Sequence, residues 1–151
     1  MKMPNASKRE IVAFQRPAKA LLVESSPLIQ RAISLMLKRL GCELDGVTES
    51  KYAVEVFKGG YDLIFLDTES SKINPHEVLK NLRFCEENLG RRSIVVGLGS
   101  EASDIYKAQG FDDFYATPLS FKDLKNIVSK WIPNYFMPAQ NERNFQLAVG
   151  F

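Results

Sequence analysis

The sequence predicts an α/β domain built on an open, doubly wound parallel sheet with helices on both faces. Short apolar runs of strand length alternate along the chain with segments that have helical spacing. One run, Tyr61–Asp67 (YDLIFLD), is almost continuously apolar, as expected for a strand buried on both faces. The length of 151 residues, 45% of them hydrophobic and 25% charged, suits one globular domain.

Strands are expected where short apolar runs end in polar or turn-forming residues. The predicted strands span residues 20–23, 42–47, 61–67, 94–98 and 114–116. The second and fifth have the weakest signals, because the second contains charged positions and the fifth is brief.

Helices are expected between these strands, where apolar residues recur every three or four positions. The predicted helices span residues 27–40, 50–58, 75–88, 103–109 and 121–131. The first helix carries an apolar stripe made of Ile29, Ala32, Ile33, Met36, Leu37 and Leu40. Leu28 and Leu35 lie outside the stripe, and they either form a contact surface or are covered by a terminal segment.

Two helix starts have clear capping signals. Pro27 suits the first position of a helix, and Ser25 or Ser26 can cap it. At the last helix, Ser120 with Asp123 three residues later forms a capping box. Both signals place a helix directly after a strand and a short loop.

Right-handed crossovers in such a sheet favour the strand order 2-1-3-4-5. The switch point then lies between the first and third strands, where ligands bind in open α/β sheets. Glu24 ends the first strand and Asp67 ends the third. We therefore expect these two carboxylates to meet at the carboxyl edge of the sheet.

Composition argues against several classes of function. The net charge of +2 gives no reason to expect nucleic acid or an anionic membrane as a partner. No apolar stretch reaches the length of a membrane span, and no secretory signal is evident. Cys42 and Cys85 form no metal-ligand set with His76, which predicts reduced thiols in a cytoplasmic protein.

The strand–helix units occupy residues 19–132, which predicts an N-terminal extension over 1–18 and a C-terminal tail over 133–151. Both extensions contain aromatic residues. They either pack partly on the domain or serve as docking or dimer-forming segments. The residues after Trp131 are too few to fold as an output domain.

Three motifs together resemble the receiver domain of bacterial two-component response regulators. They are LLVESSP at 21–27, YDLIFLD at 61–67 and GFDDFYATPL at 110–119. The resemblance covers about residues 18–132 and implies a flavodoxin-like (βα)5 fold.

The resemblance implies roles for three residues. Asp67 matches the aspartate that accepts a phosphoryl group from a histidine kinase. Glu24 matches the first of two acidic residues that hold Mg²⁺ with that aspartate. Phe114 matches the switch aromatic of the fifth strand.

The chain departs from the family at three other site positions. Ser25 stands in place of the second acidic residue, Gly99 in place of a Ser or Thr that bonds the phosphoryl group, and Thr117 in place of a Lys. Phosphoryl transfer depends on positioning and on stabilising charge, so these departures predict weak or absent phosphorylation and weak Mg²⁺ binding at Glu24 and Asp67. Without the lysine, the two carboxylates should raise the pKa of at least one of them.

The sequence therefore predicts a degenerate pseudo-receiver, with no enzymatic activity, that acts in a phosphorelay through protein–protein contacts. Its partner would be a histidine kinase or another signalling protein. The family also forms homodimers through the fourth helix, fifth strand and fifth helix, where Phe114, Tyr115 and Phe121 lie. Two alternatives stay open: a competent phosphoacceptor receiver and a flavodoxin-like protein that binds a small molecule.

Two further features lie close to these positions. Glu69 follows Asp67 by two residues and is expected to be an exposed loop residue, although it would otherwise add negative charge to the site. Gly97, Gly99 and Ala102 resemble part of a dinucleotide-binding fingerprint, but their place in the fourth unit favours a turn of small residues.

Overall fold

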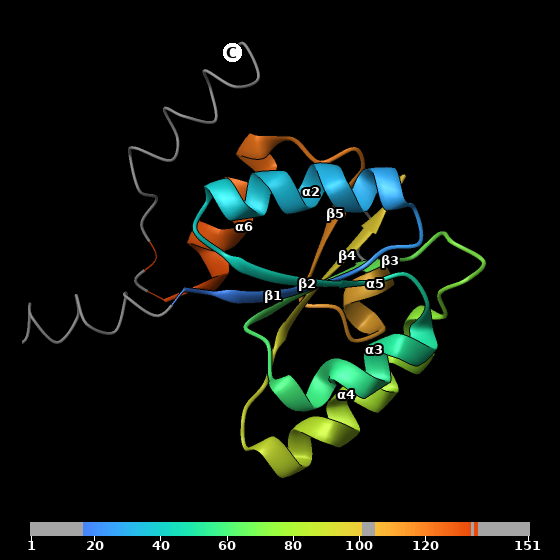
Figure 1. The fold of residues 1–151 in the computed structure, drawn as a ribbon. Helices are drawn as coiled ribbons and strands as arrows, with labels where there is room; N and C mark the ends of the chain where they lie inside the picture. The colour runs from blue at the N-terminus through green and yellow to red at the C-terminus, as the bar shows by residue number, and fades with distance from the viewer. Residues whose placement is uncertain (1–16, 101–104, 134, 136–151) are drawn as a thin grey trace, which may run out of the picture.

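The computed structural model describes residues 17–100, 105–133 and 135, and these form a single parallel sheet flanked by helices (Figure 1). The strands are β1 (Lys19–Val23), β2 (Glu43–Val47), β3 (Leu63–Asp67), β4 (Ile94–Gly99) and β5 (Asp113–Ala116). Their order is β2-β1-β3-β4-β5, which confirms the predicted α/β fold class and strand order.

The helices begin and end near the predicted positions, except that the predicted start of the fourth helix at residue 103 lies outside the described residues. They are α2 (Pro27–Arg39), α3 (Ser50–Val56), α4 (Pro75–Leu89), α5 (Ile105–Ala108) and α6 (Phe121–Trp131), and a 3₁₀ turn, η1 (Phe57–Gly59), extends α3. Ser26 caps α2, because its Oγ accepts a hydrogen bond from Ile29 N–H at 3.3 Å. The capping box of Ser120 and Asp123 is present as predicted.

Two apolar layers sandwich the sheet. On one face, α2 and α6 pack on alternate residues of β1, β3 and β4, including Leu22, Phe65 and Val96. On the other face, α3 and α4 pack on the intervening residues, including Leu21 and Ile64, and α5 lies on this same side (Figure 1). Because both faces are covered, the central strands are apolar throughout.

The apolar stripe of α2 is shorter than predicted. Ile33 and Leu37 are buried, whereas Ile29 is 42% exposed and Ala32 is exposed. The helix begins at the carboxyl edge of the sheet, so its first turns extend past the strands that its later turns cover. Leu28, outside the stripe, is 79% exposed.

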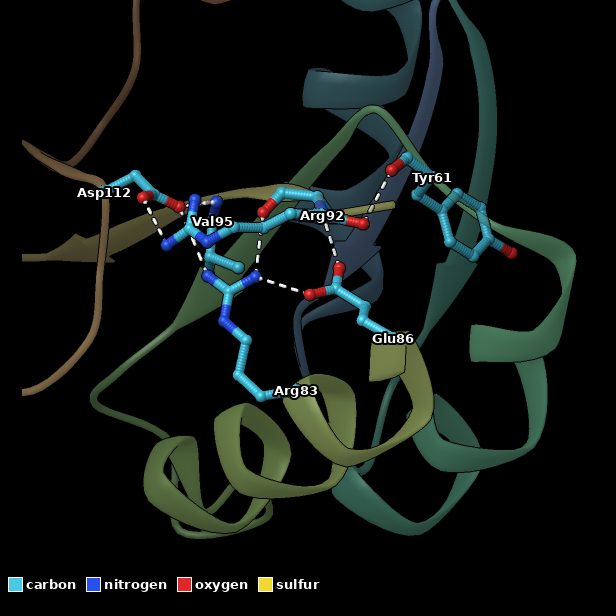
Figure 2. Close-up of polar contacts among 7 residues, drawn as sticks. Tyr61, Arg83, Glu86, Arg92, Val95 and Asp112 are labelled. Carbon is cyan, nitrogen blue, oxygen red and sulfur yellow. Dashed lines mark hydrogen bonds and ion pairs between the residues drawn. The ribbon is translucent and has the colours of Figure 1, made fainter. Parts of the chain in front are cut away.

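A polar cluster lies at the edge of the sheet where β4 and β5 begin, opposite to the carboxyl edge (Figure 2). Arg83 donates hydrogen bonds to the buried Glu86 at 2.8 Å, to the carbonyl oxygen of Ser93 at 2.9 Å and to Asp112 at 3.3 Å. The Asp112 carboxylate also accepts a hydrogen bond from Val95 N–H and forms an ion pair with Arg92. Basic residues therefore balance the acidic groups at this edge.

Cys42 is buried and Cys85 is partly buried, and neither is in a disulfide. Tyr135 packs against the α2–α6 layer and donates a hydrogen bond to the carbonyl oxygen of Leu40 at 2.6 Å. None of the helices in the described part of the chain is long and apolar enough to cross a membrane.

Candidate functional site

Two carboxylates lie side by side at the carboxyl edge of the sheet. In the parallel register of β1 and β3, Val23 pairs with Leu66, so Glu24 and Asp67 follow at the same level. Glu24 is only 5% exposed, and its Oε2 accepts a hydrogen bond from Ser26 N–H at 3.0 Å. Asp67 is partly exposed, and its Oδ1 accepts one from Glu69 N–H at 2.9 Å. The fold thus brings together the two residues that the strand order predicted.

The environment of Glu24 disfavours its charge. Burial raises the pKa of Glu24, the hydrogen bond from Ser26 N–H lowers it, and the charge of Asp67 and a hydrogen bond with Asp67 raise it again. The net direction is upward from the ordinary value, as predicted for one member of the pair. Burial contributes more than Asp67 does, which the sequence pattern alone did not indicate.

The donor set suits Mg²⁺ only in part. Glu24 and Asp67 supply two hard carboxylate oxygens, and the half-buried Ser25 adds a neutral hydroxyl in place of a third charge. Within the described ranges, no three His, Cys, Asp or Glu side chains converge as a metal site. Any Mg²⁺ held by these residues would keep most of its water ligands.

Gly99 ends β4, and neighbouring side chains fill the space beside it. A Cβ atom placed on Gly99 would lie 2.9 Å from Phe114 Cζ, 2.9 Å from Thr68 Oγ1 and 3.3 Å from Glu69 Oε2. Phe114 itself is 8% exposed and packs edge to face on Phe111, with ring centroids 6.2 Å apart. The aromatic ring therefore points inward and uses the room that a larger residue at position 99 would need.

Two hydroxyls near this strand end are engaged with the backbone. Thr117 donates from Oγ1 to the carbonyl oxygen of Gly99 at 3.1 Å, and its N–H donates to the same oxygen at 2.7 Å. Thr68 donates from Oγ1 to the carbonyl oxygen of Leu98 at 2.9 Å. Both side chains link strand ends, and neither supplies a positive charge.

Glu69 is exposed, as predicted, but it makes specific contacts. Its Oε2 accepts hydrogen bonds from Ser100 N–H at 2.9 Å and from Ser100 Oγ at 2.7 Å. These two bonds hold the pKa of Glu69 below its ordinary value. In the part of the chain that the structure describes, Glu24, Asp67 and Glu69 form no ion pair with a Lys or Arg.

Comparison with known proteins identifies the family of the chain. A scan of protein-family models gives no match to the chain. The chain is 33% identical over 117 residues to two-component response regulator 24 of Arabidopsis thaliana, and the match covers 74% of the chain and 81% of that protein. The chain belongs to the two-component response regulators. It is also 29% identical over 128 residues to hybrid signal transduction histidine kinase F of Dictyostelium discoideum, of which it spans 12%.

Solved receiver domains have the same fold. The receiver domain of the sensor histidine kinase PA1611 from Pseudomonas aeruginosa is 28% identical with a TM-score of 0.67, and the match covers 77% of this chain and 98% of that one. The receiver domain of Saccharomyces cerevisiae Ssk1, solved with the histidine phosphotransfer protein Ypd1, is 22% identical with a TM-score of 0.67. That match covers 76% of this chain and 88% of the other.

The structure of this response regulator places the predicted site residues at one edge. Glu24, Ser25 and Asp67 lie at the ends of β1 and β3, whereas Gly99 and Thr117 lie together at the ends of β4 and β5. Their functional roles stay predictions.

Ser100 was not among the predicted site residues, although it directly follows Gly99 and carries a hydroxyl. Its position next to Gly99 could have indicated Ser100 as a site residue. The sequence gives no signal for the two hydrogen bonds from Ser100 to Glu69.

Proposed function

We propose that this response regulator is an atypical receiver that signals through protein–protein contacts, with weak or absent phosphorylation of Asp67. One observation carries the proposal: Glu24, Asp67 and Glu69 lie at the same edge of the sheet without an ion-paired Lys or Arg in the described ranges. A phosphoryl group brought to Asp67 would add negative charge to an edge that already repels it.

The missing donors have a large expected effect on phosphoryl transfer. Each pre-organised donor that is lost from a reaction centre typically costs about 3 kcal/mol of transition-state stabilisation. Thr117 offers no charge and its hydroxyl is bonded to Gly99, while Gly99 offers no side chain at all. The losses need not add, but each slows the same step.

Weak Mg²⁺ binding fits this proposal. Glu24 and Asp67 would hold the ion together with water, and the ion would supply charge neutralisation for an incoming phosphoryl group. The PA1611 receiver has a magnesium ion coordinated in its active-site cleft. Here the raised pKa of Glu24 works against the ionised carboxylate that the metal requires.

A competent phosphoacceptor is the second candidate, and the position of Asp67 favours it. The Asp67 carboxylate ends β3, is partly exposed and is fixed by one hydrogen bond from Glu69 N–H. A phosphodonor could therefore reach it. Slow modification with weak Mg²⁺ support would be the expected behaviour.

We propose that the partner is a histidine kinase or a histidine phosphotransfer protein. The Ssk1 receiver domain was solved in complex with a protein of the second class. We also propose that homodimers would use the α5–β5–α6 face. Phe114 is buried there, so partly exposed Tyr115 and Phe121, with exposed Ile105, would supply the apolar contacts.

Incubation with acetyl phosphate and Mg²⁺, followed by intact-protein mass spectrometry, tests the proposal. We expect little or no added phosphoryl mass, and an Asp67→Asn variant gives the background. Stoichiometric modification that disappears in Asp67→Asn would refute the atypical reading and establish the second candidate. Mass detection is preferable to fluorescence, because Trp131 donates a hydrogen bond to Asp113 at the opposite edge of the sheet.

A further inference from the structure

The loop after β3 crosses the end of β4 and is fixed there by hydrogen bonds. Thr68 N–H donates to the carbonyl oxygen of Leu98 at 2.9 Å, which holds the loop beside β4. The next residue, Glu69, then receives both donors of Ser100 on a single carboxylate oxygen. The contact joins positions 31 residues apart in the chain.

Two donors that converge on one oxygen make a small anion-binding arrangement. A backbone N–H and a hydroxyl are the same groups that would bond an oxygen of a phosphoryl group or another oxyanion. At this edge the hydroxyls of Thr68 and Thr117 are committed to backbone carbonyl groups. Ser100, two residues beyond the Leu98 that pairs with Asp67, therefore carries a pair of donors that an anion at this edge could use, and Glu69 occupies them.

We propose that Glu69 is an internal anionic ligand, which binds the N–H and hydroxyl of Ser100 and keeps external oxyanions away from the Asp67 site. This inference rests on the proposed function in that it explains how the Asp67 site is closed to phosphate. It assigns the closure to one side chain of this chain, in addition to the missing lysine and hydroxyl.

Three features favour the internal ligand over an external anion. Glu69 is tethered two residues from Asp67, so its effective concentration at Ser100 is high. Its charge would also repel a second anion. Its carboxylate is ionised at neutral pH, and the two bonds from Ser100 favour this charged form, which lowers its pKa. The full exposure of the side chain limits the strength of the contact, because water and salt screen it.

The test is a titration of the full chain with inorganic phosphate at low ionic strength, followed by the NMR shift of the Ser100 amide. We expect Glu69→Ala to bind phosphate at Ser100 at least about threefold more tightly than the wild type, the size typical of an exposed charge contact. Glu87→Gln is the matched control, since Glu87 is exposed on α4 and its loss changes the net charge by the same amount. It should titrate like the wild type.

A double variant tests the donor competition directly. Adding Ser100→Ala to Glu69→Ala should reduce the gain, because the hydroxyl donor is removed. An undiminished gain, or an equal gain in Glu87→Gln, would overturn the inference. So would a Glu69→Ala protein whose Ser100 amide responds no more than that of the wild type.

The failure of this inference and that of the proposed function are distinguishable. Stoichiometric phosphorylation of wild-type Asp67 refutes the atypical receiver. An unmodified wild type, together with a Glu69→Ala variant that gains no affinity for phosphate, refutes only the internal ligand.

Discussion

The ring of Phe114 occupies the space toward which a side chain on Gly99 would point. A Cβ atom at position 99 would approach Phe114 Cζ to 2.9 Å, and a Cβ atom at Gly97 would approach Phe114 Cδ2 to 2.5 Å. The small residues of β4 and the buried ring of β5 are therefore complementary in volume. A hydroxyl cannot be restored at position 99 without moving this ring.

The first prediction concerns this complementarity. Gly99→Ala should lower the free energy of unfolding by about 1–3 kcal/mol, the usual cost of overpacking a core. Urea denaturation measures it. In Gly59→Ala, the added Cβ would meet the flexible Nζ of Lys19 at 3.2 Å and the Tyr61 hydroxyl at 4.0 Å, so this control should stay within about 0.5 kcal/mol.

A double-mutant cycle gives the outcome that would contradict it. Phe114→Leu replaces the ring with a shorter side chain, so Gly99→Ala should cost less in that background than in the wild type. Equal costs in the two backgrounds would mean that the ring does not limit position 99.

The second prediction concerns the buried charge of Glu24. Because the folded pKa is raised, the wild type loses stability as pH rises from the ordinary value of 4.5 through the folded pKa. Without Mg²⁺, Glu24→Gln should therefore be more stable than the wild type at pH 7, because the amide carries no charge to bury. The two proteins should converge below pH 4.5 in urea denaturation. A variant that is less stable than the wild type at neutral pH would show that the charge is well solvated.

The third prediction concerns Asp113 at the opposite edge. Burial raises its pKa, but hydrogen bonds from Trp131, from Phe114 N–H and from Lys130 outweigh burial and leave the pKa below the ordinary value. Its contribution to stability is thus present above pH 3.8 and is lost as pH falls through the lower folded pKa. Asp113→Asn should cost about 2 kcal/mol at pH 7 and less at low pH.

Urea unfolding curves followed by Trp131 fluorescence, recorded from pH 7 to below pH 3.8, measure how the cost of Asp113→Asn changes with pH. Lys130→Met is the control, because the Lys130 side chain is 57% exposed and its ion pair should contribute less than about 1 kcal/mol. A cost of Asp113→Asn that does not change with pH would contradict the assignment to ionised Asp113.

The fourth prediction concerns the polar cluster in Figure 2. Arg83→Met leaves Glu86 buried without its guanidinium partner, and breaking a buried pair in this way typically costs about 3 kcal/mol. Arg92→Met breaks an ion pair of a side chain that is 55% exposed, so it should cost less than about 1 kcal/mol. Urea denaturation of both variants measures the two costs, and a loss of stability in Arg92→Met as large as that in Arg83→Met would contradict the prediction.

The sequence predicted the sheet well because its signals are local. The apolar run before Asp67 identified a central strand, and the cap of Ser120 with Asp123 located the start of α6. Strand order followed from general rules of handedness, and it placed Glu24 beside Asp67 correctly.

The contacts that the sequence did not predict join residues far apart in the chain. Arg91 pairs with Asp62 and Arg92 pairs with Asp112, and no pattern in the sequence indicated either pair. The bonds from Ser100 to Glu69 are of the same kind. No periodicity records such pairs, because they depend on which loop ends the fold brings together.

The hydrogen bond from Tyr135 to Leu40 has a practical meaning for the choice of fragments. The Tyr135 hydroxyl lies beyond the strand–helix units and donates to the carbonyl oxygen of Leu40, the residue that caps the end of α2. A shortened protein that stops at Ile132 would lose that closing hydroxyl and uncover the apolar surface beneath the ring. Expression variants for binding studies should therefore keep the chain through Tyr135, so that an altered affinity is not mistaken for the effect of a loosened helix end.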